Sequence, residues 1–244
     1  MKQGLFKIEE NINLTKDVMK MRLSGDTSNI TKPGQFINIQ LDGLYLRRPI
    51  SVCDCDEKSV TIIYKIVGKG TEKMQEMKDG SLDVLAGLGN GYDTSLSGDT
   101  PLLLGGGVGV PPLYMLAKEL IKEGKKPSVV LGFNTKDEIF YEDEFKALGL
   151  NVYVTTVDGS YGIKGFVTDA MKEINYSYIY TCGPEPMLKA IYSASETSGQ
   201  FSFEERMGCG FGACMGCSCK TVTGYKRICK EGPVLLKEEI LWEK

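Results

Sequence analysis

Residues 205–217 read ERMGCGFGACMGC and hold three of the eight cysteines in this chain of 244 residues. With one later residue they form a closely spaced set: Cys209-x4-Cys214-x2-Cys217-x11-Cys229. The first residues, MKQGLFKIEENINL, lack the apolar stretch of a secretory signal, so we expect a cytoplasmic chain whose thiols are reduced. Clustered cysteines in such a chain indicate metal ligands before they indicate disulfides.

This spacing predicts an iron–sulfur cluster, because a C-x4-C-x2-C run with a distant fourth cysteine is typical of plant-type [2Fe–2S] proteins. Glycines surround the cysteines, as expected for a loop that wraps a cluster closely and points its backbone N–H groups at the sulfurs. In an extended segment Cys219 would share a face with Cys217, so geometry alone does not exclude Cys219 as a cluster ligand. We leave it out because the spacing already provides four ligands. The alternative is a structural zinc knot, although such knots usually show two symmetric cysteine pairs.

The composition excludes several other chemistries. The chain has no histidine, which rules out Ser-His and Cys-His nucleophile pairs, His-ligated zinc or haem, and Rieske clusters. Its 29 Lys and Arg against 32 Asp and Glu leave no basic excess for nucleic acid. The sequence contains no run of about 18 apolar residues, which is the length needed to span a membrane. A protein whose cofactors carry the redox chemistry needs no side chain that titrates near neutrality.

Upstream of the cysteines, the pattern predicts two further domains. Residues 1–97 contain short alternating runs such as 35–41, separated by Gly, Pro, Asn and Asp, which predicts an antiparallel β-barrel with one short helix over 71–78. In residues 98–200, strands and helices alternate, which predicts an α/β domain with a parallel sheet. Residues 201–244 hold the cysteines and little else periodic, so we expect a small C-terminal cluster module in a multidomain protein.

Two motifs of the α/β region favour a nucleotide ligand. Residues 104–112, LGGGVGVPP, join a predicted buried strand to a helix, where backbone N–H groups can approach a pyrophosphate. The turn does not match G-x-G-x-x-G, and no ribose-binding acid follows the second strand at 132–134, so a turn used only for packing is the alternative. Residues 181–187, TCGPEPM, end a late strand where ligands bind in open α/β sheets. Cys182 is equally well explained as a small buried residue.

Two motifs of the barrel region fit a phosphate-bearing cofactor. Residues 47–51, RRPIS, place an arginine beside a hydroxyl, which together can pair with a phosphate and a flavin edge. Residues 68–71, GKGT, open the short helix with Thr71 as its predicted N-cap, and the N-terminus of that helix can bind a second pyrophosphate. The alternative for the arginines is a solvated strand end.

Together, the RxxS, GGGxGxxP and CGPxxM motifs resemble those of the ferredoxin–NADP reductase superfamily over essentially the whole chain. The ERMxCGxGxCxGC stretch, followed by RxCxxGPV at 227–234, closely resembles the electron-transfer subunits of type B dihydroorotate dehydrogenases. The resemblance implies that NAD(H) docks on the α/β domain, that the barrel holds FAD, and that a [2Fe–2S] cluster connects to FMN in a catalytic partner. That partner would oxidise dihydroorotate in pyrimidine (UMP) biosynthesis, in a cytoplasmic heterotetramer of two copies of each subunit.

The resemblance also assigns residues. The FAD would be held by Arg48, Pro49, Ile50, Ser51, Ile63, Tyr64, Lys65, Gly70 and Thr71. The nicotinamide cofactor would lie along Gly106, Gly107, Cys182, Gly183 and Pro184. The cluster ligands would be Cys209, Cys214, Cys217 and Cys229. No residue of this chain is expected to be a catalytic base.

Several points stay open in the sequence. A related FAD/[2Fe–2S] subunit of a ferredoxin-dependent transhydrogenase or a sulfhydrogenase shares most motifs, and only the ERMxCG stretch argues against it. The alternative from another class of function is a nucleotide-binding module whose fold is stabilised by zinc and which has no redox function. NADP-preferring reductases that resemble this chain tend to present Arg-Ser where it has Asn134-Thr135-Lys136, which favours NADH. We expect the cluster loop to meet the partner through Met207, Phe211 and Met215.

Overall fold

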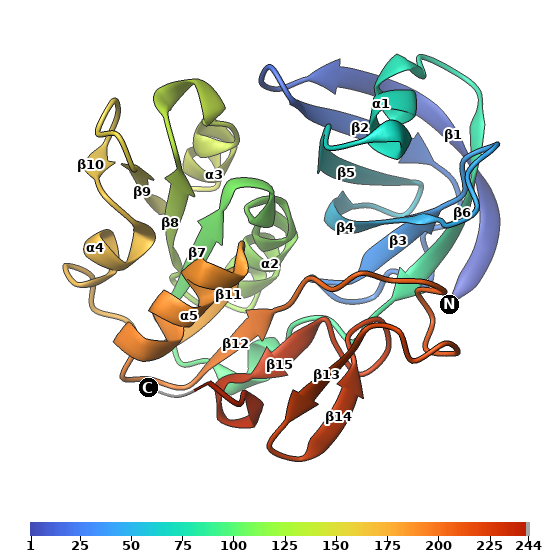
Figure 1. Cartoon of the computed structure of the whole chain (residues 1–244). Helices are drawn as coiled ribbons and strands as arrows, with labels where there is room; N and C mark the ends of the chain where they lie inside the picture. The colour runs from blue at the N-terminus through green and yellow to red at the C-terminus, as the bar shows by residue number, and fades with distance from the viewer. Residues whose placement is uncertain (243–244) are drawn as a thin grey trace.

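The computed structural model describes residues 1–242 and begins with a closed barrel of antiparallel strands in the order β1-β2-β5-β4-β3-β6 (Figure 1). The strands are β1 Lys2–Asn13, β2 Val18–Ser24, β3 Phe36–Ile39, β4 Arg48–Cys55, β5 Ser59–Lys65 and β6 Ser81–Leu88. In β2, Met19, Met21 and Leu23 are buried in the barrel core. Lys20 and Arg22 between them remain accessible, which is the alternation of a half-buried strand. The predicted antiparallel barrel is confirmed.

The short helix of the barrel, α1 Lys69–Glu76, begins two residues earlier than the sequence predicts. Gly68 is its N-cap, so the prediction that Thr71 occupies this position is wrong. Thr71 instead lies in the first turn, where its Oγ1 accepts the N–H groups of Val67 at 2.9 Å and Gly68 at 3.3 Å. A threonine in the first turn can reach back to the N-cap backbone, which is why its presence does not fix the start of the helix.

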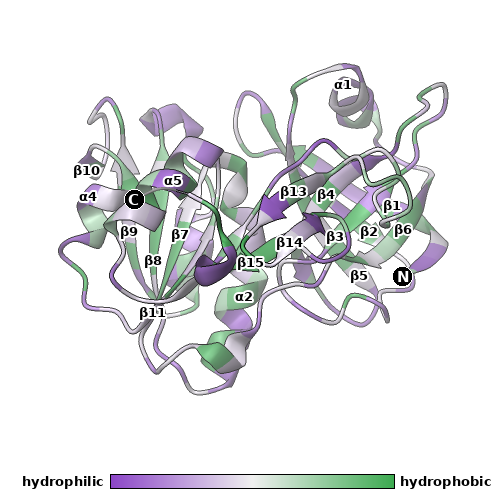
Figure 2. Cartoon of the chain, turned by 60° about the horizontal axis from the view of Figure 1, so that its bottom comes forward, coloured by the Kyte–Doolittle hydropathy of each residue, from purple (hydrophilic) through white to green (hydrophobic). Residues whose placement is uncertain are grey.

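The second sheet follows the order β10-β9-β8-β7-β11-β12-β15 and is parallel except at β15. Its strands are β7 Pro101–Gly106, β8 Ser128–Phe133, β9 Asn151–Thr156, β10 Ile163–Lys164, β11 Tyr178–Cys182, β12 Gly199–Ser202 and β15 Val234–Leu236. All residues of β7 are buried, as a central parallel strand covered on both faces requires. Figure 2 shows hydrophobic residues along these strands. The predicted parallel α/β sheet is confirmed.

Helices cover both faces of this sheet. The helices are α2 Pro111–Lys122, α3 Glu142–Ala147, α4 Val167–Met171 and α5 Glu185–Ala194, with 3-10 turns η1 Thr94–Leu96, η2 Gly107–Gly109, η3 Lys136–Glu138 and η4 Lys237–Glu239. Apolar side chains of α2 and α3 pack on one face, and those of α4 and α5 pack on the other. Within residues 1–242, no helix has both the length and the apolar character needed to cross a membrane.

The C-terminal region is built into the other two parts of the molecule. It contains the hairpin β13 Ser218–Thr221 and β14 Gly224–Arg227, whereas β15 joins the parallel sheet by pairing antiparallel to β12. Phe36 of β3, Cys217 and Cys229 belong to one hydrophobic cluster with residues of β7 and β11. The buried Lys237 donates from Nζ to the Ser195 carbonyl at 2.6 Å, just beyond α5. The predicted domain boundaries stay predictions, and β12 spans the second of them.

The edge strand gives a test of this integration. Leu235 is 1% exposed in β15, so we expect Leu235→Ala to lower the free energy of unfolding by about 2–5 kcal/mol through lost burial and a residual cavity. Leu241 is 49% exposed, and Leu241→Ala is the matched control with an expected change within about 0.5 kcal/mol. Urea unfolding followed by circular dichroism measures both. Equal effects of the two substitutions would contradict the burial of β15 in the main sheet.

Candidate functional site

Backbone N–H groups point at the cysteine sulfurs, as the glycine-rich loop predicts. Sγ of Cys209 accepts from the N–H groups of Ala213 at 3.2 Å and Cys214 at 3.5 Å. Sγ of Cys214 accepts from Gly216 at 3.5 Å. Sγ of Cys217 accepts from the N–H of Cys229 at 3.4 Å, which ties the distant cysteine to the loop. Such donors stabilise negative charge on sulfur and so favour bound metal.

The glycines of the loop serve two different purposes. Gly210 and Gly212 have φ values of 78° and 91°, a conformation that favours glycine. Gly208 provides space, because a Cβ on it would lie 3.2 Å from Sγ of Cys214, whereas a Cβ on Gly216 would make only an ordinary contact at 3.5 Å. The loop therefore needs glycine for its backbone conformation at positions 210 and 212 and for space at position 208.

The thiols differ in how readily they ionise. Burial alone would raise the pKa of Cys209, but the N–H groups of Cys214, Phe211 and Ala213 outweigh it and lower that pKa to about 6. Burial and the neighbouring sulfur of Cys217 raise the pKa of Cys229 to about 12. Cys209 is therefore ready to bind metal as a thiolate, whereas Cys229 needs the metal to displace its proton.

The four cysteines lie in two pairs. The backbone N–H of Cys214 donates to Sγ of Cys209, and the backbone N–H of Cys229 donates to Sγ of Cys217. In the described part of the chain, no three Cys, Asp or Glu side chains surround a point that could hold a single metal ion. A zinc knot would bring all four sulfurs to about 2.3 Å from one ion. Two pairs instead suit a [2Fe–2S] cluster, in which four cysteines are shared between two irons.

Burial raises the pKa of the remaining cysteines. Cys219 lies on β13 opposite Lys226 and packs against the hydrophobic cluster, and burial raises its pKa. Cys53 is fully buried, and burial raises its pKa to about 12. Burial likewise raises the pKa of Cys182 to about 12. These groups are neutral thiols at physiological pH.

The two adjacent arginines of the barrel have separate roles. Arg47 donates to the carbonyls of Asn38 at 3.2 Å and Asp83 at 3.1 Å, and it pairs with the Asp83 carboxylate at 2.7 Å. Arg48 instead lies against the first turn of α1, where a Cβ on Gly70 would be only 2.1 Å from its Nε. The structure therefore brings Arg48, Gly70 and Thr71 together, and places a guanidinium beside a helix N-terminus, a combination suited to a phosphate group.

The predicted FAD segments flank a gap in the strand pairing of the barrel. Strands β4 and β5 pair from Val52 and Ile62 to Cys55 and Val60, so residues 48–51 and 63–65 have no partner across this gap. The side chains of Ile63 and Tyr64 are buried, and the Tyr64 hydroxyl donates to Asn11 at 3.1 Å. Lys65 pairs with Asp17 at 3.0 Å. These residues of β5 therefore offer a ligand their backbone groups at the gap.

The glycine turn after β7 and the Cys182 loop after β11 lie side by side, because the two strands are parallel neighbours. A Cβ on Gly106 would be 2.5 Å from Sδ of Met187, and one on Gly183 would be 2.4 Å from Cε of the same residue. These two glycines permit close packing, which is the alternative noted for the turn. Gly107 has a φ of 51° and meets nothing within 4 Å, so its backbone faces open space at the carboxyl end of β7. The structure leaves room for a cofactor there.

Sequence reasoning missed an acid near the end of β8. Oε2 of Glu138 accepts from Nδ2 of Asn134 at 2.9 Å and from its backbone N–H at 3.3 Å. The carboxylate therefore sits at the carboxyl end of the second strand, although no acid stands at 132–134. The signal was present in the KDE run of residues 136–138, but only the fold of η3 returns Glu138 to Asn134.

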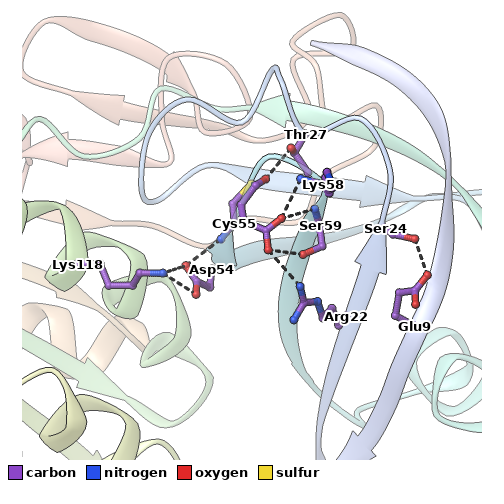
Figure 3. A network of polar contacts seen from close by, with 10 residues as sticks. Glu9, Arg22, Ser24, Thr27, Asp54, Cys55, Lys58, Ser59 and Lys118 are labelled. Carbon is purple, nitrogen blue, oxygen red and sulfur yellow. Dashed lines mark hydrogen bonds and ion pairs between the residues drawn. The ribbon is translucent and has the colours of Figure 1, made fainter.

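A network of polar contacts on the barrel lies next to an ion pair that links the barrel to the α/β domain (Figure 3). Lys118 of α2 pairs with the Asp54 carboxylate of β4 at 2.7 Å. Arg22 of β2 pairs with Asp56, in the turn between β4 and β5, at 3.1 Å. A groove lined by Arg22, Asp54 and Tyr114 lies beside this network and contains none of the predicted cofactor residues. Because β4 also carries Arg48, the Lys118 contact fixes the proposed flavin strand against the nucleotide domain.

Comparisons with known proteins agree with this arrangement. Residues 204–241 match the iron-sulfur cluster binding domain of dihydroorotate dehydrogenase B, and residues 103–193 match the oxidoreductase NAD-binding domain. The structure of an NADH-dependent reduced ferredoxin-NADP oxidoreductase is similar, with a TM-score of 0.89 and 31% identity over 98% of this chain and 90% of that one. A ferredoxin NADP+ reductase from Neisseria gonorrhoeae shares the fold, with a TM-score of 0.70 and 16% identity over 80% of this chain and 90% of that one.

Two curated relatives are similar over nearly their whole length. The electron transfer subunit of dihydroorotate dehydrogenase B (NAD(+)) from Fusobacterium nucleatum subsp. nucleatum is 49% identical over 96% of each chain. The same subunit from Bacillus pumilus is 43% identical over 98% of each chain. The iron–sulfur interpretation of the cysteine loop is thereby confirmed over the zinc alternative, and the chain belongs to the family of electron transfer subunits of dihydroorotate dehydrogenase B.

Proposed function

We propose that this chain carries electrons between NAD(H) and a catalytic dihydroorotate dehydrogenase subunit, as part of pyrimidine biosynthesis. The observation that carries the proposal is the cysteine loop, whose cysteines lie in two pairs, receive N–H donors and pack against Phe36 of the barrel. When bound, FAD supplies the conversion between the two-electron hydride of NADH and the single electrons that a [2Fe–2S] cluster carries.

The residues of the chain would bind and orient these groups. Cys209, Cys214, Cys217 and Cys229 would hold the cluster. Arg48 and the first turn of α1 would bind the FAD phosphates, while residues 49–51 and the backbone of 63–65 would line the flavin. Gly107 would leave room for the nicotinamide cofactor above β7, next to the loop at 182–184. None of these roles requires a proton to move through a side chain, which is consistent with the absence of histidine.

The cluster loop also carries exposed apolar side chains. Phe211 is 43% exposed and Met215 is 53% exposed, whereas Met207 is partly buried against the hydrophobic cluster. Electrons leave the subunit near the cluster, so an apolar surface at this position suits a partner. The relatives are named electron transfer subunits, which implies a catalytic partner. The assembly of two copies of each subunit and the cytoplasmic location stay predictions.

A second candidate function comes from the solved structure that is 31% identical to this chain, an NADH-dependent reduced ferredoxin-NADP oxidoreductase. A reductase subunit of that kind would exchange electrons with ferredoxin. The curated relatives at 43–49% identity favour the first function.

Mixing this chain with a candidate catalytic subunit tests the proposed function. The chain and a candidate FMN-containing dihydroorotate dehydrogenase subunit should form NADH from dihydroorotate only when both are present. Cys214→Ala should abolish this activity and lower the iron content, because one ligand is lost, while the partner alone still reduces artificial acceptors. Cys219→Ala, two residues beyond Cys217 on β13, is the matched control and should keep both activity and iron. Full activity in Cys214→Ala would remove the cluster from the relay, and activity with ferredoxin alone would favour the second candidate.

Coenzyme preference gives another test. We expect NADH to reduce the bound flavin about tenfold more efficiently than NADPH, because no arginine follows β8 to pair with a 2′-phosphate. The Glu138 carboxylate beside Asn134 would further disfavour a phosphate there. Stopped-flow measurement of flavin bleaching with each coenzyme decides the point. Equal rates would show that Lys136 compensates for the missing arginine.

The proposed partner surface can be disrupted without touching a ligand. We expect Phe211→Asp and Met215→Asp to weaken binding to the catalytic subunit at least about tenfold, because each would bury an unpaired charge in an apolar contact. Aspartate tolerates the positive φ of 62° at Met215, so the loop itself should persist. Leu96→Asp, at an exposed position outside the loop, is the control. Titration of the two subunits by calorimetry measures the affinity, and unchanged binding would place the interface elsewhere.

A further inference from the structure

A buried amide joins the barrel to the cluster loop. Asn38 lies on β3 and is 1% exposed, and its Nδ2 donates to the backbone carbonyl of Cys209 at 3.3 Å. Because a carbonyl can only accept, the amide nitrogen faces it, and this sets the orientation of the side chain. The hydrogen bond therefore connects a barrel strand to the peptide of the first proposed cluster ligand.

The next residue of the loop is shaped to allow this contact. Gly210 has a φ of 78°, and a Cβ on it would lie 2.3 Å from Nδ2 of Asn38. A side chain at position 210 would push the loop away from β3. The close approach thus depends on both partners, a buried amide on the barrel and a glycine in the loop.

The same strand is the neighbour of the proposed flavin strand. Asn38 pairs directly with Pro49 of β4, and the Asn38 carbonyl accepts from Arg47 at 3.2 Å. Directly paired residues of antiparallel strands project on the same face, so Asn38 and Pro49 share the outer face of the barrel. Phe36, two residues earlier on β3, packs with Cys217 and Cys229. This face therefore lies between the predicted flavin residues and the cluster loop.

The oxygen of the Asn38 amide lacks a hydrogen-bond donor in the part of the chain that the structure describes. Oδ1 of Asn38 is buried and has no hydrogen-bond partner among residues 1–242. A buried acceptor without a donor is unfavourable, and an apolar residue of similar volume would avoid the loss. A buried asparagine with an unpaired acceptor lowers stability, so its role is to be sought in the contact that its donor makes with Cys209.

We propose that Asn38 is a positioning residue for electron transfer, holding the Cys209 peptide at a fixed place beside the flavin strand so that the two cofactor sites keep one relative geometry. This inference rests on the proposed assignment of Cys209 as a cluster ligand. The role is distinct from ligation, because Asn38 contacts the backbone of the ligand residue and not its sulfur.

The test uses the full-length chain with FAD and cluster bound. Asn38→Leu and Asn38→Asp keep the number and branching of the side-chain heavy atoms and remove the donor. The control is Gln35→Leu, which removes another buried amide just before β3. The hydrogen bonds of Gln35 go to Thr31, Lys32 and Gly89, all outside the cluster loop. Three quantities are measured: the rate of flavin bleaching by NADH, the subsequent rate of cluster bleaching, and the electron paramagnetic resonance spectrum of the dithionite-reduced cluster.

We expect both Asn38 variants to reduce flavin at the wild-type rate, to reduce the cluster at least about tenfold more slowly, and to shift or broaden its resonance signal. Gln35→Leu should change neither the second rate nor the signal. Loss of the cluster from Asn38→Leu, with FAD retained and the Gln35→Leu cluster intact, would equally support the tie. Wild-type cluster rates and spectra in both Asn38 variants, or the same changes in Gln35→Leu, would overturn it.

The failure of this inference can be told apart from failure of the proposed function. A wild-type chain without iron or a resonance signal would reject the cluster assignment itself. A wild-type chain with both, together with unaffected Asn38 variants, would reject only the positioning role.

Discussion

The C-terminal region depends on accommodating four cysteine sulfurs, which range from the exposed Cys214 to the buried Cys217 and Cys229 and would be thiolates as metal ligands. Such thiolates require donors close by, and the chain supplies them from its own backbone, with N–H groups of Ala213, Cys214, Gly216 and Cys229 directed at the sulfurs. The loop must turn sharply to direct these donors, and Gly210 and Gly212 adopt the positive φ values that the turns need. The loop is then too poor in apolar side chains to form a core of its own, which explains why it is packed against the rest of the molecule.

That dependence accounts for the way the C-terminal region is attached. Cys217 and Cys229 are buried in a cluster that also contains Phe36 of the barrel, and β15 adds a strand to the nucleotide domain. Arg227 of β14 donates to the carbonyl of Gly212 at 2.6 Å while pairing with Glu231, so the hairpin also braces the loop. The cluster region is thus held from both sides, which places its cysteines beside the two domains that would carry the other cofactors.

The sequence was informative where chemistry fixes spacing or periodicity. The cysteine pattern, the alternating runs of the barrel and the strand over 128–133 were predicted from residues alone, and the structure confirms strand β8 at those bounds. What escaped prediction depends on contacts distant in sequence. No residue near Asn38 in the sequence indicates that its side chain contacts Cys209. The three residues of β15 show no strand pattern of their own, and only their pairing with β12 makes them a strand. The start of α1 was missed because Thr71 caps from within the first turn.

Neutral amides recur where the parts of the chain meet, and their chemistry suggests why. Asn90, at the end of the barrel, donates to the carbonyl of Val234 at 2.7 Å and accepts its N–H at 3.1 Å. Gln200 of β12 likewise donates to the Asp93 carbonyl at 2.7 Å and accepts its N–H at 2.8 Å. An amide satisfies both backbone groups without a net charge. Its hydrogen bonds are therefore much less sensitive than an ion pair to a nearby centre that gains and loses an electron, since the Coulomb energy of an ion pair changes directly with each unit of charge nearby. Asn90 and Gln200 therefore join the parts of the chain without adding charge, whereas the ion pairs Lys118–Asp54 and Arg227–Glu231 hold other junctions.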